Sequence, residues 1–121
     1  MKNIVLFDMD GTLTPPRKSL DTLLLGPLKV LARYADIGVV TGSDYNYVKE
    51  QLKFLIENSY IRYKLHLLPC NGTKHYTPPS YNHEEHKLES ETNFKEKIGE
   101  NNFNRIMKIL IDYQNYICSH F

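Results

Sequence analysis

The sequence has little cysteine, no excess of charge and no long apolar run. Its two cysteines are far apart and form no CxxC or zinc-like spacing, which argues against a disulfide framework or a zinc module. Fifteen basic and fourteen acidic residues give a net charge of +1, so no overall field favours nucleic acid. No apolar stretch approaches the roughly 20 residues of a membrane span, and the amino-terminal residues do not resemble a signal peptide. We therefore expect a cytoplasmic protein without nucleic-acid or membrane partners.

What remains is the composition of one globular domain. The chain has 121 residues, of which 41% are hydrophobic and 24% charged. Three short apolar segments are predicted to be strands, and they are separated by helical patterns: Ile4–Phe7, Ile37–Val40 and Leu65–Leu68. The first of these is wholly apolar, which predicts a strand buried on both faces, as in a parallel sheet. The alternation predicts an α/β fold built from βαβ units.

The helical patterns between these strands have recognisable limits. Leucines recur at helical spacing through residues 20–34, and Gly26-Pro27 divides this segment into two pieces, the second starting near Pro27. A further helix follows the second strand, with Ser43 or Asp44 as its N-cap. Asn71-Gly72, after the third strand, is expected to be a structural turn.

The composition changes after residue 77. Residues 77–93 are polar and contain two prolines, which indicates a linker or a weak hairpin. Within this segment, His83-Glu-Glu-His86 lacks the H-E-x-x-H pattern of a helical zinc site, and we expect it to be solvated. Residues 102–117 then show the apolar stripe of an amphipathic helix.

Two carboxylates directly follow the first predicted strand. In a parallel α/β sheet, ligands bind beyond the carboxyl ends of the strands, which is where Asp8 and Asp10 are expected. One carboxylate can act as a nucleophile while the other transfers a proton. A carboxylate that attacks a phosphate dianion meets like-charge repulsion, so such a site favours a divalent cation, with Mg²⁺ as the natural candidate. The alternative is that both are ordinary turn residues.

Three segments carry a resemblance to a known family. FDMDGTLT resembles the first motif of the haloacid dehalogenase (HAD) superfamily of phosphatases and phosphotransferases. LFDMDGTLTPPR, IGVVTGSDYNYVKEQL and LPCNG resemble, in order and spacing, the eukaryotic-type phosphomannomutases. The resemblance implies a HAD-like Rossmannoid parallel sheet, present in part over residues 1–78. Residues 79–121 would be a linker and the beginning of an α+β cap domain.

The resemblance also implies roles for individual residues. Asp8 would be the nucleophile that becomes an aspartyl-phosphate, and it would ligate Mg²⁺. Asp10 would be the general acid/base, with its backbone carbonyl as a second metal ligand. Arg17 falls where the family has an arginine that contacts the sugar phosphate.

The second motif of the family falls at the end of the second predicted strand. There the resemblance implies that Thr41, Gly42 and Ser43 bind the phosphoryl group through a hydroxyl and backbone amides. Free N–H groups at the start of the following helix suit an anion independently of the resemblance. Taken alone, the same residues are also a plausible helix cap.

The function implied is that of a Mg²⁺-dependent phosphotransferase which converts mannose 6-phosphate to mannose 1-phosphate, with a phosphorylated hexose as partner. The family's later basic residue, its acidic metal ligands and its cap arginines find no match after Gly72. Two alternatives therefore stay open: a sugar-phosphate phosphatase, or a catalytically incomplete HAD fragment that serves as a binding or interaction module. Without the family's further strands, Ile4–Phe7 is expected to be an exposed apolar edge, covered by a second copy in a homodimer or by a missing carboxyl-terminal half.

Overall fold

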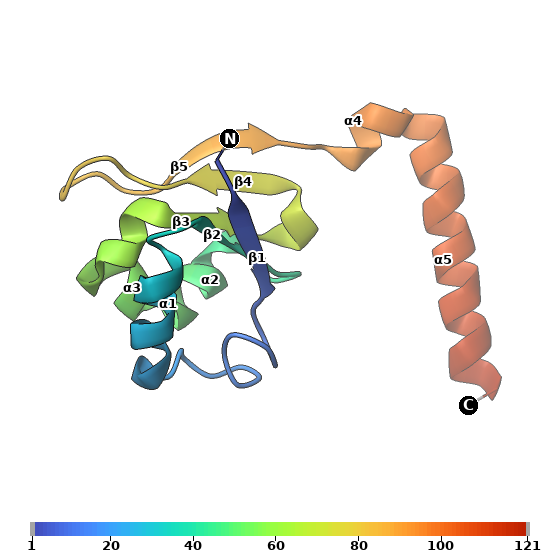
Figure 1. Cartoon of the computed structure of the whole chain (residues 1–121). Coiled ribbons are helices and arrows are strands. Elements are labelled where there is room, and N and C mark those ends of the chain that lie inside the picture. Colours follow the sequence, from blue (N-terminus) through green and yellow to red (C-terminus); the bar gives the residue numbers. More distant parts are fainter. Residues whose placement is uncertain (1, 121) are drawn as a thin grey trace. The chain divides into compact units, whose positions relative to one another are not determined.

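Five strands form one sheet in the order in which they occur along the chain (Figure 1). β1 (Ile4–Asp8), β2 (Asp36–Val40) and β3 (Leu65–Leu68) are parallel to one another. β4 (Lys74–Thr77) and β5 (Lys87–Glu91) continue the sheet in antiparallel orientation. The predicted α/β class and all three predicted strands are confirmed.

The computed structural model describes residues 2–120. The chain forms two compact units, Met1–Glu91 and Thr92–Phe121. The division comes later than the expected boundary after residue 78, because β5 pairs with β4 and so belongs to the sheet. Of the two expectations for residues 77–93, the hairpin is therefore the one that the structure contains.

Three helices of the first unit lie on one face of the sheet (Figure 1). These are α1 (Leu25–Leu31), α2 (Tyr45–Gln51) and α3 (Lys53–Asn58), and short 3₁₀ turns occupy Thr22–Leu24, Tyr60–Lys64 and Cys70–Gly72. Apolar side chains from this face and from the helices form the core, among them Leu28, Ile37, Val39, Val48, Leu52, Leu55, Leu65 and Leu67.

The helix boundaries follow the local signals in the sequence. The segment before β2 contains two helical pieces, as predicted, but the second begins at Leu25 and places Pro27 in its first turn, where a missing N–H is tolerated. Asp44 is the N-cap of α2, since its carboxylate accepts a hydrogen bond from the Tyr47 N–H at 2.8 Å. The expected turn at Asn71-Gly72 is confirmed, and both residues have positive φ.

The expectation that the first strand is buried on both faces is wrong. Ile4 and Leu6 are 45% and 57% exposed, whereas most of β2 is buried. β1 lies at the edge of the sheet, and Ile4 and Leu6 occupy the face opposite the helices, beside Gly38 of β2. The expected exposed apolar edge is therefore present.

The second unit consists of two helices. α4 (Phe94–Ile98) is capped by Asn93, and α5 (Glu100–His120) contains the predicted amphipathic helix. Several apolar residues of α5 are exposed, including Ile109 at 66%. Within residues 2–120, no helix combines the length and the apolar character needed to cross a membrane.

Candidate functional site

The carboxyl end of β1 runs into a tight loop that holds both predicted carboxylates. The carbonyl of Met9 accepts hydrogen bonds from three later N–H groups, those of Thr12, Leu13 and Thr14, at 3.2, 3.0 and 3.0 Å. Gly11, at φ 79°, allows the chain to turn within this loop. Met9 is fully buried, so it anchors the loop in the core and leaves Asp8 and Asp10 on either side of it.

Asp8 is exposed and has few protein partners. Its Oδ2 accepts one long hydrogen bond, at 3.3 Å, from the hydroxyl of Thr12. Asp8 is paired in register with Val40, the last residue of β2, so it lies next to the loop that begins at Thr41. A carboxylate placed in this way can accept a further ligand without losing a structural bond.

Asp10 is held more firmly than Asp8. Its Oδ1 accepts two hydrogen bonds, from the backbone N–H of Arg17 at 3.0 Å and from the Tyr47 hydroxyl at 3.1 Å. Burial, the bond to Asp10 and the charge of Asp10 raise the pKa of Tyr47 above the ordinary value of 10.0, although the Arg17 charge acts in the opposite direction. Tyr47 is therefore protonated at neutral pH and acts as the donor.

The loop after β2 is tied to the turn after β3. The Thr41 side chain is nearly buried, and its Oγ1 accepts a hydrogen bond from the Ser43 N–H at 3.2 Å. The carbonyls of Thr41 and Ser43 accept hydrogen bonds from the N–H groups of Asn71 and Cys70, at 2.7 and 2.8 Å. A Cβ added to Gly42 would lie 3.1 Å from Oδ1 of Asn71, so glycine suits this close approach.

The structure thus gathers the predicted site residues at one edge of the sheet. Asp8, Asp10 and Thr41 follow two adjacent parallel strands, and Arg17 joins them through its backbone bond to Asp10. The Arg17 side chain is exposed. Sequence reasoning missed Tyr47, although one signal was available: it lies in the first turn of the helix that follows the second motif.

No group of three or more His, Cys, Asp and Glu side chains in residues 2–120 is arranged to hold a metal ion. Asp8 and Asp10 are two carboxylates at one strand end. Mg²⁺ is commonly bound through one or two carboxylates together with water and substrate phosphate oxygens. The donor types at this edge are compatible with that kind of coordination.

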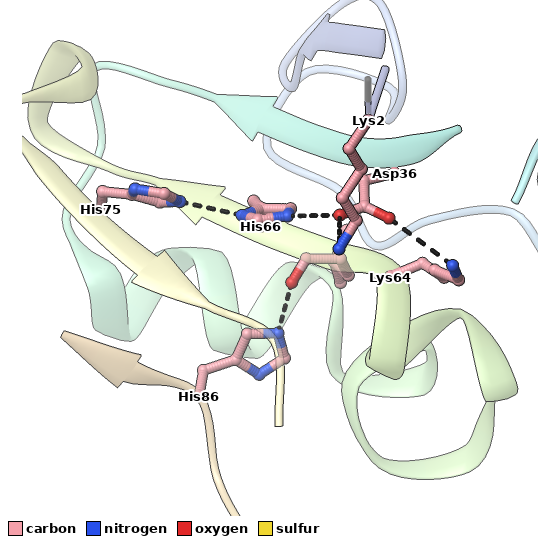
Figure 2. Close-up of polar contacts among 7 residues, drawn as sticks. Lys2, Asp36, Lys64, His66, His75 and His86 are labelled. Carbon is pink, nitrogen blue, oxygen red and sulfur yellow. Dashed lines mark hydrogen bonds and ion pairs between the residues drawn. The ribbon is translucent and has the colours of Figure 1, made fainter. Parts of the chain in front are cut away.

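A second polar cluster lies elsewhere on the sheet, as Figure 2 shows. Asp36, at the start of β2, accepts a hydrogen bond from Nε2 of His66 at 2.9 Å, and Nδ1 of His66 lies 2.8 Å from Nε2 of His75. Lys2 and Lys64 approach the same carboxylate at 3.0 and 3.8 Å. We name these five residues the Asp36 cluster.

Burial and hydrogen bonding together set the pKa values in the Asp36 cluster. Burial alone would raise the pKa of Asp36, but hydrogen bonds from His66 and Lys2 outweigh it, and the net pKa lies below the ordinary value of 3.8. Burial and the neighbouring His66 lower the pKa of His75.

His86 lies near this cluster, and the expectation that it is solvated is wrong. It is only 8% exposed, not solvated, because its Nε2 donates a hydrogen bond to the carbonyl of Leu65 at 2.8 Å (Figure 2). Burial lowers the pKa of His86.

A cavity of about 550 Å³ lies away from the predicted site. Tyr45, Lys49, Arg62 and His86 are among its lining residues, and neither Asp8 nor Asp10 is. Its lining carries charges of both signs, and it does not follow the carboxyl end of a parallel strand. The strand-end carboxylates are therefore the better candidate site.

Comparison with known proteins identifies sequence relatives of the chain. No protein-family model matches the chain. A phosphomannomutase from Dendrobium officinale is 32% identical over 110 residues, which are 91% of this chain and 39% of that protein. One from Arabidopsis thaliana is 47% identical over 57 residues, which are 47% of this chain and 23% of that protein. The chain thus spans well under half the length of these curated relatives.

Solved structures share the fold at low sequence identity. The Plasmodium falciparum IMP-nucleotidase matches with a TM-score of 0.71 and 14% identity, covering 99% of this chain and 36% of that one. The Aspergillus fumigatus trehalose-6-phosphate phosphatase matches with a TM-score of 0.53 and 21% identity, covering 95% and 39%.

The sheet order and the carboxylates at the end of β1 define a HAD-type α/β protein. In sequence the chain is similar to the phosphomannomutases, and together with the shared fold this similarity supports a HAD superfamily member close to them.

Proposed function

We propose that this chain carries the nucleophile half of a Mg²⁺-dependent phosphotransferase site of the phosphomannomutase type. The observation that carries the proposal is the contrast within one loop: Asp8 is exposed with a single long hydrogen bond, whereas Asp10 is held by two donors. A nucleophile needs a free oxygen, and a general acid needs a defined position.

In the proposed reaction, an oxygen of Asp8 attacks the phosphorus of a sugar phosphate. The bond from phosphorus to the sugar oxygen breaks, its electron pair stays on that oxygen, and Asp10 donates the proton that the oxygen takes up. The phosphoryl group is then carried by Asp8 until a sugar hydroxyl accepts it, with Asp10 taking the proton back. Bound Mg²⁺ would neutralise phosphate charge, with Asp8 and the Asp10 carbonyl as its protein ligands.

The binding of the phosphoryl group is assigned to the loop after β2. The Thr41 hydroxyl and the backbone at Gly42 and Ser43 lie next to the strand that ends in Asp8, which supports this role. The exposed side chain of Arg17 is free to reach a sugar phosphate. The proposed substrate is mannose 6-phosphate, converted to mannose 1-phosphate.

The test is an activity assay of the purified chain with Mg²⁺. We expect turnover of p-nitrophenyl phosphate and of mannose 1-phosphate, lost on chelation of the metal and in Asp8→Asn. Isomerised sugar phosphate would identify a mutase, and inorganic phosphate alone would identify a phosphatase. A folded chain that shows no turnover dependent on Asp8 would refute catalysis by these residues and leave the role of a binding module.

A further inference from the structure

Tyr47 reaches from the first turn of α2 to the loop after β1. Its hydroxyl donates to Oδ1 of Asp10 at 3.1 Å, and the backbone N–H of Arg17 donates to the same oxygen at 3.0 Å. The two donors come from different segments of the chain, so together they restrict rotation of the Asp10 carboxyl group.

The backbone conformation at both donor residues, Tyr47 and Arg17, is well defined. The backbone of Tyr47 is fixed by its own N–H bond to the Asp44 cap, and its ring packs against the hydrophobic core. Arg17 has φ 55°, a left-handed conformation that residues other than glycine seldom adopt, and this conformation accompanies its N–H bond to Asp10.

We propose that Tyr47 is a positioning residue: by holding the carboxyl group of Asp10, it determines which of the two oxygens transfers the proton. An oxygen that already accepts two hydrogen bonds is a poor site for a proton. Oδ1 is therefore the anchored oxygen, and Oδ2 is the one that carries the proton and delivers it to the leaving group. This inference rests on the proposed function, because it refines the role of Asp10 in that reaction.

The step balances without any further reactant. As the bond between phosphorus and the leaving oxygen breaks, the proton moves from Oδ2 of Asp10 to that oxygen, and Asp10 becomes a carboxylate. Tyr47 keeps its own proton throughout and only strengthens its hydrogen bond as the charge on Asp10 develops.

The experiment compares Tyr47→Phe with Tyr45→Phe in the full chain with Mg²⁺. Both variants lose one phenolic hydroxyl from the same helix, but the Tyr45 ring stacks on Tyr76, and the hydroxyl that donates to Asp10 is that of Tyr47. Each variant is assayed on p-nitrophenyl phosphate, whose leaving group needs little protonation, and on an alkyl phosphate, whose leaving group needs a proton. The parameter is kcat/KM, because it covers the steps up to release of the leaving group.

We expect Tyr47→Phe to lower kcat/KM for the alkyl phosphate roughly tenfold and to change that for p-nitrophenyl phosphate much less. Tyr45→Phe should leave both values unchanged. Equal losses on both substrates would indicate a merely structural role for Tyr47, and no loss on either would likewise overturn the inference. If the unmodified chain shows no turnover that depends on Asp8, the proposed function itself fails, which is a different result from a failure confined to Tyr47.

Discussion

Two carboxylates at different places on the same sheet have opposite surroundings. Asp36, at the start of β2, is 2% exposed and bonded to His66 and Lys2 (Figure 2). Asp8, at the end of β1, is exposed and has one hydrogen bond at 3.3 Å.

The difference separates a structural carboxylate from one available for chemistry. A buried charge is costly unless it is paired and hydrogen-bonded. At Asp36, Oδ2 is bonded to His66 and Lys2, whereas Oδ1 has no hydrogen-bond partner among the described residues and lies 3.8 Å from the Lys64 ammonium. A carboxylate in water needs no protein partner, and its oxygens remain open to a metal or a phosphate. Site candidates in this chain are therefore the acidic groups with free oxygens at the carboxyl ends of parallel strands.

The largest expected effect on stability is that of Asp36→Ala. This change leaves Nε2 of His66 without its acceptor, and we expect the free energy of unfolding to fall by about 2 kcal/mol. Lys2→Ala is the matched control: its side chain is 73% exposed, so the change should be close to zero. Denaturant unfolding at pH 7.5 measures both, and equal effects would contradict the special role of the histidine bond.

Acidification should destabilise the first unit by less than Asp36→Ala does. The pKa values of His75 and His86 are lowered below the ordinary 6.5, so the unfolded chain binds protons more readily than the folded one. Their contribution to stability is complete above about pH 6.5 and is lost as the pH falls toward the folded values. Asp36, whose pKa is also lowered, loses its contribution only below 3.8.

Denaturant unfolding at pH 7.5 and pH 5.5 tests whether the free energy of unfolding falls on acidification. The double variant His75→Gln/His86→Gln should show a smaller difference between the two pH values than the unmodified chain does. Greater stability at pH 5.5 than at pH 7.5 would be inconsistent with the lowered histidine pKa values.

Thr41→Val should cost about 1 kcal/mol, because it removes the acceptor of the Ser43 N–H bond. Thr41→Ser keeps the hydroxyl and should recover most of the loss in thermal or denaturant unfolding. If the valine and serine variants unfolded alike, the hydroxyl bond would not be what holds this loop.

The smallest effect on stability is expected for Asp8→Asn, within about 0.5 kcal/mol of the unmodified chain. The same change should lower phosphotransfer at least a thousandfold, since it removes the nucleophile. A marked loss of stability together with activity would assign Asp8 to the structural group beside Asp36.

Much of the fold was predictable because the signals for it are local. The apolar segments that became β2 and β3, the cap at Asp44 and the turn at Asn71 each depend on a few adjacent residues. Burial of β1 was predicted wrongly, because a strand's apolar residues do not reveal whether a second strand or a helix covers them. The burial of His86 was missed for the same reason: its partner, the carbonyl of Leu65, is distant in the sequence.

The sequence by itself determined the order of strands and helices and placed Asp8 and Asp10 at a strand end, because periodicity and turn residues act over short distances. Only the tertiary structure decided which carboxylate oxygens are free and which are occupied. The donors on Asp10 come from the loop at Arg17 and from α2, and those on Asp36 come from β3 and the amino terminus. Such pairings depend on how distant segments pack, which short-range patterns do not encode.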